Sequence, residues 1–199
     1  SASRLDDLQC AFSSLKGFLA GEKKEYMAVH CVLDNEEVGS GTKQGAASTF
    51  LYDTLTRAHE SLGLTREDYL IHLADSFMVS ADNAHAVHPN YPEKMDPVNR
   101  TYLNGGIVLK FNANQKYCTD GVSAAMFRDI CRKAGVPVQT FTNRSDMAGG
   151  STLGNISNTQ VALNTVDIGL PQLAMHSPYE TVGVKDTGYL VRAAEVLFC

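Results

Sequence analysis

The spacing of apolar residues along the chain predicts helices that alternate with strands. Apolar side chains recur at helical intervals over residues 5–20, at Leu5, Leu8, Phe12, Leu15 and Leu19. Similar spacing predicts helices over residues 44–62, 66–76, 121–134 and 185–198, and a further helix after the glycine turn at 148–157. Short apolar runs bounded by turn residues predict strands over residues 25–33, 77–82, 106–113, 136–142 and 162–169. The run EYMAVHCVL at residues 25–33 is expected to be a buried strand.

This alternation favours one α/β domain. The chain has 199 residues, enough for a single sizeable core, and no repeat, low-complexity tract or linker divides it. Alternating strands and helices are typical of a mainly parallel sheet covered by helices on both faces. We therefore expect a three-layer α/β/α fold with a mixed, mainly parallel sheet. Ligands of such folds bind where strands end, at the carboxyl edge of the sheet.

Composition narrows the choice of partners. The chain is 44% hydrophobic and 20% charged, with a formal net charge of −5. This acidic balance argues against a nucleic-acid or anionic membrane partner, because no basic cluster is present to offset the phosphate charge. No apolar run approaches the roughly 20 residues that span a bilayer. Five cysteines without a C-x-x-C pair predict reduced thiols rather than disulfides or a thiolate zinc site, so we expect a cytoplasmic protein.

Three carboxylates crowd the segment VLDNEEVGSGT at residues 32–42, namely Asp34, Glu36 and Glu37. Crowded carboxylates repel one another unless a cation neutralises them or they share protons, and both situations are typical of functional sites. The alternative is a solvated acidic loop. Adjacent side chains of an extended segment point to opposite sides. Glu36 and Glu37 are therefore expected to divide the work, one as metal ligand and one as general base.

A second cluster, SADNAHAVHPNY, offers Asp82, His85 and His88 within seven residues. Imidazole and carboxylate together are the ligands of catalytic zinc, manganese or cobalt. For each histidine alone, a hydrogen-bonded structural imidazole is the alternative. Asp82 differs because it is the last residue of an apolar strand. An unpaired buried carboxylate there costs roughly several kcal/mol.

Two further elements complete the candidate set. His176 ends the apolar segment LPQLAM, and Asp6 and Asp7 open the first helix, where helix capping is the alternative interpretation. Together with the two clusters they suggest a site with two metal ions bridged by a carboxylate. The turn AGGSTLGNIS lacks the lysine of a phosphate-binding loop, so it is expected to border the site rather than bind a nucleotide.

Six segments carry a family resemblance: RLDDL, DNEEVGS, SADNAHAVHPNY, VLKFNANQKYCTD, GGSTLGNIS and DIGLPQLAMHS. In order and spacing they resemble the aspartyl aminopeptidase family of dinuclear zinc exopeptidases, of a bacterial type, from about residue 3 to the last helix. The resemblance implies the zinc-exopeptidase (phosphorylase/hydrolase-like) fold. It also implies two divalent metal ions, zinc with manganese or cobalt as alternatives, and hydrolysis of N-terminal residues, preferentially Asp or Glu, from peptides.

The resemblance also implies roles for individual residues. Asp6 matches the carboxylate that bridges the two metals, and Asp7 stands where the family more often has Asn. Glu36 matches the general base. Glu37 and His176 match ligands of one metal.

The remaining matched residues concern the other metal and the substrate. Asp82 matches a ligand of the other metal, and His85, Lys110 and Tyr117 resemble residues that line the substrate pocket. Lys110 is expected to attract the acidic N-terminal side chain of the peptide. Its alternative is an outward-facing lysine on an edge strand.

The sequence also departs from the family. It has no H-x-D segment, which supplies a metal-binding histidine, and no inserted oligomerisation domain. The chain is therefore expected to be the C-terminal portion of a metallo-aminopeptidase catalytic domain, with a fold incomplete at the N-terminus and a homo-oligomer as the full-length form. We expect the isolated chain to bind metal weakly, to hydrolyse little and to self-associate. The alternatives are a glutamyl or broad-specificity aminopeptidase and a non-catalytic fragment or paralogue.

Overall fold

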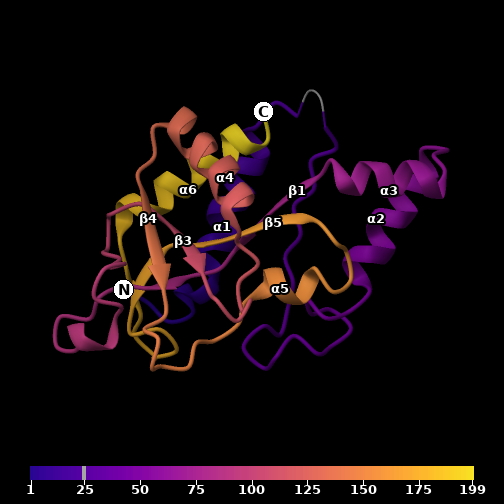
Figure 1. The fold of residues 1–199 in the computed structure, drawn as a ribbon. Helices are drawn as coiled ribbons and strands as arrows, with labels where there is room; N and C mark the ends of the chain where they lie inside the picture. Colours follow the sequence, from indigo (N-terminus) through magenta and orange to yellow (C-terminus); the bar gives the residue numbers. More distant parts are fainter. Residues whose placement is uncertain (24–25) are drawn as a thin grey trace.

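The computed structural model describes residues 1–23 and 26–199 (Figure 1). The helices are α1 (Leu5–Ala20), α2 (Phe50–Ser61), α3 (Arg66–Ala74), α4 (Gly121–Ala134), α5 (Leu153–Ser157) and α6 (Val184–Leu197), with a 3-10 turn η1 (Pro92–Lys94). The strands are β1 (Phe77–Ala81), β2 (Ala84–His85), β3 (Ile107–Phe111), β4 (Val138–Thr142), β5 (Asn164–Gly169), β6 (Pro171–Leu173) and β7 (Thr181–Val182). The predicted helices that correspond to α1, α3, α4 and α6 are confirmed, as are the strands β1, β3, β4 and β5.

The main sheet has four strands in the order β1-β5-β3-β4. β1 pairs with β5 and β3 with β4 in parallel, whereas β3 and β5 run antiparallel. The predicted mixed, mainly parallel sheet is therefore confirmed. A small second sheet, β2-β6-β7, was not predicted. Its parallel pair β2 and β6 follows β1 and β5 after a short break, across which the Asp82 and Ala84 N–H groups donate to the carbonyls of Ile168 and Leu170.

Helices cover both faces of the main sheet. Helices α1, α4 and α6 pack together against one face, and the short helix α5 lies against β1 and β5 on the other (Figure 1). Alternation along β3 matches these layers. Ile107 and Leu109 point into the core beneath the helices, while Val108 joins a second cluster on the opposite side. Lys110 belongs by this alternation to the same side as Val108.

The predicted buried strand at residues 25–33 is wrong over its described part, residues 26–33. No strand forms there, and residue 25 lies outside the described residues. Tyr26 is 79% exposed, and Met27 and Val32 are also exposed. An apolar run becomes a strand only when a neighbouring strand satisfies its backbone groups, and no strand of the described residues pairs with this one. The apolar side chains therefore remain uncovered.

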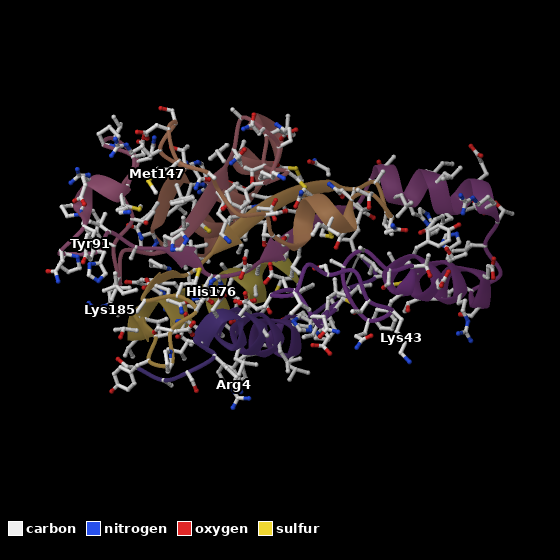
Figure 2. All side chains as sticks on the ribbon, turned by 90° about the horizontal axis from the view of Figure 1, so that it is seen from below. Arg4, Lys43, Tyr91, Met147, His176 and Lys185 are labelled. Atoms are coloured by element: carbon white, nitrogen blue, oxygen red, sulfur yellow. The ribbon has the colours of Figure 1, made fainter. Side chains whose placement is uncertain are left out.

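The predicted helix over residues 44–62 begins later than expected, at Phe50. Residues 44–49 form turns instead, in which the Gly45 and Ser48 N–H groups donate to the carbonyls of Thr42 and Gly45. In both views the pair α2 and α3 projects from the body of the molecule (Figure 1 and Figure 2).

The five cysteines are free thiols, which confirms the expectation from their spacing. Among the helices of the described residues, none combines the length and apolar character needed to cross a bilayer.

Candidate metal centre and cavity

One cavity gathers all eight predicted site residues. It has a volume of about 350 Å³ and lies beyond the end of β1 and beside the turn that follows β6. Its lining includes Asp6, Glu36, Glu37, Asp82, His85, Lys110, Tyr117 and His176. Residues far apart in the sequence therefore meet at one place, as expected for a ligand site at the ends of strands.

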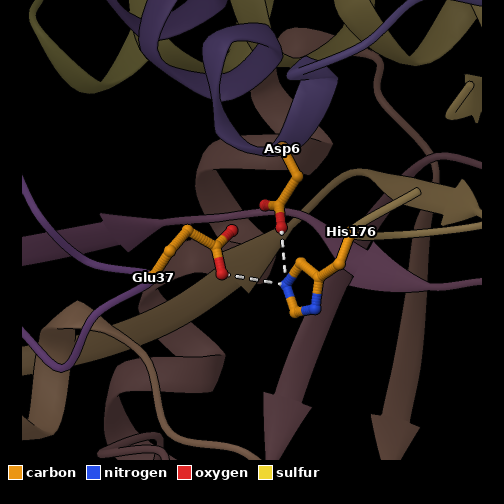
Figure 3. Close-up of side chains that lie close together, drawn as sticks. All are labelled: Asp6, Glu37 and His176. Carbon is orange, nitrogen blue, oxygen red and sulfur yellow. Dashed lines mark ion pairs between the residues drawn. The ribbon is translucent and has the colours of Figure 1, made fainter. Parts of the chain in front are cut away.

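Asp6, Glu37 and His176 form the first group of possible metal ligands (Figure 3). Nε2 of His176 lies 3.2 Å from Asp6 Oδ2 and 3.1 Å from Glu37 Oε2. Ligands of a tetrahedral zinc ion at its usual bond lengths lie about 3.3 Å apart. One ring nitrogen carries at most one proton, so it cannot donate a straight hydrogen bond to both carboxylates. A cation between the three side chains satisfies all of them.

Asp6 also belongs to a second group, with Asp7 and Asp82, whose oxygens lie within 4.8 Å of one another. Asp6 Oδ1 and Asp7 Oδ1 are buried without a hydrogen-bond partner. Burial, followed by the charge of Asp82, raises the pKa of Asp6 to about 9 and that of Asp7 well above its ordinary value. Divalent cations relieve the same repulsion that protons relieve here. The donor set therefore fits metal ions, with Asp6 shared between two groups.

The capping interpretation is wrong for Asp6, whereas Asp7 does occupy a capping position. The residue before the helix is Arg4, which makes no side-chain cap hydrogen bond. Asp6 and Asp7 themselves have non-helical backbone angles, so regular helix begins after them. The Asp6 carboxylate lines the cavity. The Asp7 carboxylate accepts a hydrogen bond from the Cys10 N–H in the first turn of the helix and also lies near Asp82.

Lys110 and Thr152 both donate hydrogen bonds to Asp82. Lys110 Nζ donates to Asp82 Oδ2 at 3.2 Å, and Thr152 Oγ1 donates to the same oxygen at 2.9 Å. Although burial opposes it, the Lys110 charge together with hydrogen bonds from Asp6 and Thr152 holds the pKa of Asp82 below its usual range. The Asp82 carboxylate is therefore charged, and the ammonium group of Lys110 is its positive partner.

The environment of Lys110 corrects one interpretation. The side chain is 3% exposed, and β3 lies between β5 and β4, so Lys110 is not an outward-facing lysine on an edge strand. Despite burial, the charge of Asp82 raises the pKa of Lys110. Its Nζ also lies 5.4 Å from the ring centroid of Tyr117. The positive charge expected to meet the substrate is thus paired with Asp82 in this structure.

Gly169 makes the approach of Lys110 to Asp82 possible. A Cβ atom at this position would lie 2.2 Å from the Asp82 carbonyl oxygen and 2.9 Å from Lys110 Cε. Only the absence of a side chain leaves room for both groups.

Glu36 has the properties of a proton acceptor. Burial, followed by the charges of Asp82 and Glu37, raises the pKa of Glu36 to about 7. A group with a pKa near neutrality is suited to take up and release protons at physiological pH. The neighbouring Glu37 carboxylate is 53% exposed and approaches His176, which agrees with the expected division of work between adjacent positions.

Two residues of the candidate clusters lie outside the cavity. The ring of His88 stacks near Tyr91 at 5.2 Å, and its Nδ1 accepts a hydrogen bond from the Asn90 N–H. This is the structural role weighed as its alternative. Asp34 is exposed, and its N–H donates to the Gln44 carbonyl.

Some residues that hold the site residues in place through hydrogen bonds were not predicted from the sequence. Thr152 lies in the glycine turn, which borders the cavity as predicted, but its bond to Asp82 was not foreseen. Asn83 Nδ2 donates to Gln9 Oε1 at 2.9 Å and thereby ties α1 to the end of β1. Glu180 is 2% exposed, and its carboxylate accepts hydrogen bonds from the backbone N–H groups of Asp6 and His176. The only sequence signal for Glu180 was its charge, four residues after the candidate ligand His176 in the segment MHSPYE.

An α/β fold with carboxylates and an imidazole converging beyond its strands is typical of metal-dependent hydrolases. Known proteins agree. The sequence model of the aminopeptidase I zinc metalloproteases (M18) matches residues 1–198. A probable M18 family aminopeptidase 2 from Clostridium acetobutylicum is 48% identical over 198 residues, covering 100% of this chain and 46% of that protein. The chain belongs to the M18 aminopeptidase family.

Solved structures agree in fold. Ape4, in a cryo-EM structure of its complex with Nbr1, superposes with a TM-score of 0.90 at 38% identity, over 99% of this chain and 38% of the other. The Saccharomyces mApe1 dodecamer superposes with a TM-score of 0.82 at 30% identity, over 99% and 45% of the two chains. The chain thus spans about half the length of the curated relatives it matches.

Proposed function

We propose that the chain carries the metal centre and general base of an aminopeptidase that removes N-terminal residues, preferentially Asp or Glu, from peptides. The observation that carries the proposal is the shared position of Asp6 in two groups of possible metal ligands. In this proposal Glu37 and His176 complete the site of one divalent ion and Asp82 belongs to the other. Zinc is the first choice, since the family consists of zinc metalloproteases, with manganese or cobalt as alternatives.

The bound ions would supply a water of lowered pKa and a Lewis acid for the peptide carbonyl. Glu36 takes the proton from the attacking water and later delivers it to the leaving amine. In the metal-free structure the pKa of Glu36 is raised to about 7, which suits this carboxylate to take up and release protons near neutral pH. Tyr117 and His85 line the same cavity and are proposed to contact the peptide.

The adjacent glutamates provide the test. In the full-length enzyme, Glu36→Gln should abolish hydrolysis and leave the zinc content unchanged, because a general base does not hold the metal. Glu37→Gln is the matched control at the next position, and it should lower the zinc content as well. Elemental analysis and peptide hydrolysis of both variants measure this. Retained turnover in Glu36→Gln would remove Glu36 from the role of base.

A broad-specificity aminopeptidase is the second candidate, because the charge of Lys110 is already paired with Asp82. The acidic preference rests on Lys110 turning toward the substrate. Rates on peptides with N-terminal Asp and N-terminal Ala separate the two candidates in a Lys110→Met variant. A loss confined to the acidic peptide favours the first candidate, and an equal loss on both favours the second.

The whole protein's assembly is also part of the proposal. We propose that this chain is the C-terminal portion of a catalytic domain, within a cytoplasmic protein that forms a homo-oligomer. The exposed apolar residues at 26–33 support this proposal, since they offer an uncovered surface to a further segment. The missing H-x-D histidine would leave the Asp82 ion incompletely held in the isolated chain.

A further inference from the structure

Glu180 joins two of the possible metal ligands through their backbones. Its Oε2 accepts a hydrogen bond from the Asp6 N–H at 3.0 Å, and its Oε1 accepts one from the His176 N–H at 2.8 Å. The backbone of Glu180 is itself fixed by a pair of hydrogen bonds with Ala2, at 3.0 and 2.9 Å. One buried side chain therefore connects the start of α1 with the turn after β6.

Both N–H groups need an acceptor that their own segments do not provide. Asp6 has non-helical angles of φ −84° and ψ 112° at the start of α1, where N–H groups lack intrahelical partners. His176 has φ 65°, a left-handed conformation that costs a non-glycine residue about 1–2 kcal/mol. These backbone angles determine where the Asp6 carboxylate and the His176 ring point.

The chemistry of the acceptor is specific. The two N–H groups reach different oxygens, so both oxygens must accept at once. A carboxylate does this, whereas a glutamine would turn an NH₂ group toward one of the two donors. The carboxylate is 2% exposed, and a buried charge is costly unless hydrogen bonds compensate it. A role at the metal centre explains why a charge occupies this position.

We propose that Glu180 is a positioning residue of the metal centre, which fixes the backbones of Asp6 and His176 so that their side chains are spaced as ligands before metal binds. This inference rests on the proposed function, because it requires that Asp6 and His176 bind metal. Hydrogen bonds to a charged acceptor are stronger than neutral ones, so the carboxylate resists displacement of either ligand.

The test is a zinc titration of the purified protein against a competing chelator, with thermal unfolding measured on the same samples. In Glu180→Gln the zinc affinity should fall by about 10–100-fold, the usual effect of losing a group that orients a metal ligand. The matched control is Asp186→Asn. Asp186 is also fully buried and accepts two backbone N–H groups, from Asn104 at 2.6 Å and Gly106 at 3.0 Å, but it does not line the cavity. Both variants should lose stability, and only Glu180→Gln should lose zinc affinity.

Wild-type zinc affinity in Glu180→Gln, alongside a loss of stability like that of Asp186→Asn, would overturn the inference and leave the proposed metal centre intact. A wild-type protein that binds no zinc would instead refute the metal centre, and the inference with it. If Glu180→Gln does not fold, Glu180→Asp serves in its place. It keeps both oxygens but withdraws them by one methylene, so its zinc affinity should also fall, and an unchanged affinity would overturn the inference.

Discussion

Replacing Lys110 by methionine tests how the charge of Asp82 is balanced beneath the cavity. Methionine has a similar length and keeps the apolar contacts, so the change removes little besides the ammonium group. Lys110 Nζ lies 3.2 Å from Asp82 Oδ2, and the two side chains are 3% and 15% exposed. Removing one partner of a buried ion pair costs about 3–5 kcal/mol, because the other charge is left uncompensated.

The lower end of that range applies here. Thr152 still donates to Asp82 after the replacement, and Asp82 can take up a proton. A loss of about 3 kcal/mol corresponds to a fall in Tm of roughly 6–12 °C for a chain of this size. Zinc bound beside Asp82 would supply a positive charge in place of the ammonium group. The loss should therefore be smaller with zinc than with EDTA.

Thermal unfolding followed by circular dichroism, in EDTA and in zinc, measures both quantities. The control is Lys133→Met, which removes a lysine that is 59% exposed and paired with Asp129 at 2.9 Å. An exposed pair of this kind contributes about 0.2–1 kcal/mol, so the control should barely change the Tm. A Lys110→Met variant in EDTA that unfolds at the same temperature as Lys133→Met would refute the dependence of Asp82 on Lys110.

Two further predictions concern proton balance and packing. The pKa of Asp6 is raised to about 9 and that of Glu36 to about 7, so the folded, metal-free state binds more protons than the unfolded chain. Their contribution to the free energy of unfolding is complete below about pH 4 and is lost as the pH rises through 7 and 9. Urea unfolding in EDTA measures this loss. A free energy of unfolding that rises over this range would contradict the prediction. Gly169→Ala should destabilise by about 1–3 kcal/mol because of overpacking against Asp82 and Lys110. The control Gly188→Ala, inside α6 with no neighbour within 4 Å, should stabilise by up to about 1 kcal/mol, and a similar urea midpoint for both variants would count against the argument.

Helices and main strands were predictable because their pattern is local. The helices α4 and α6 bury an apolar face against the sheet, and such a face appears in the sequence as a helical period. In α1 the apolar period predicted the helix but not its buried face, since Leu8, Phe12, Leu15 and Leu19 are exposed and the buried residues are Gln9, Cys10, Ser13 and Gly17. The apolar run at 26–33 carries the signal of a buried strand, but no strand among the described residues pairs with it, and no periodicity reveals this. The strands β2, β6 and β7 have only two or three residues, too few for any period to appear.

The candidate site divides in a similar way. Asp82 and His176 stand out because each ends an apolar segment, and Glu36 and Glu37 stand out because like charges crowd there. The contribution of Glu180 depends on which backbone N–H groups come near it after folding, and this is tertiary information.

The pairing of Lys110 was hidden for the same reason. Its burial and its contact with Asp82 follow from the place of β3 between two other strands, together with the space left at Gly169. A lone lysine in an apolar strand signalled a special environment, but the sequence did not show which charge it meets.

The most direct test of the metal centre is anomalous X-ray diffraction from crystals of the protein grown with zinc. A strong zinc peak should lie within bonding distance of Asp6, Glu37 and His176, and a second one should lie between Asp6 and Asp82. Zinc bound only elsewhere on the chain, or no zinc peak near Asp6, would contradict the assignment of these residues as metal ligands.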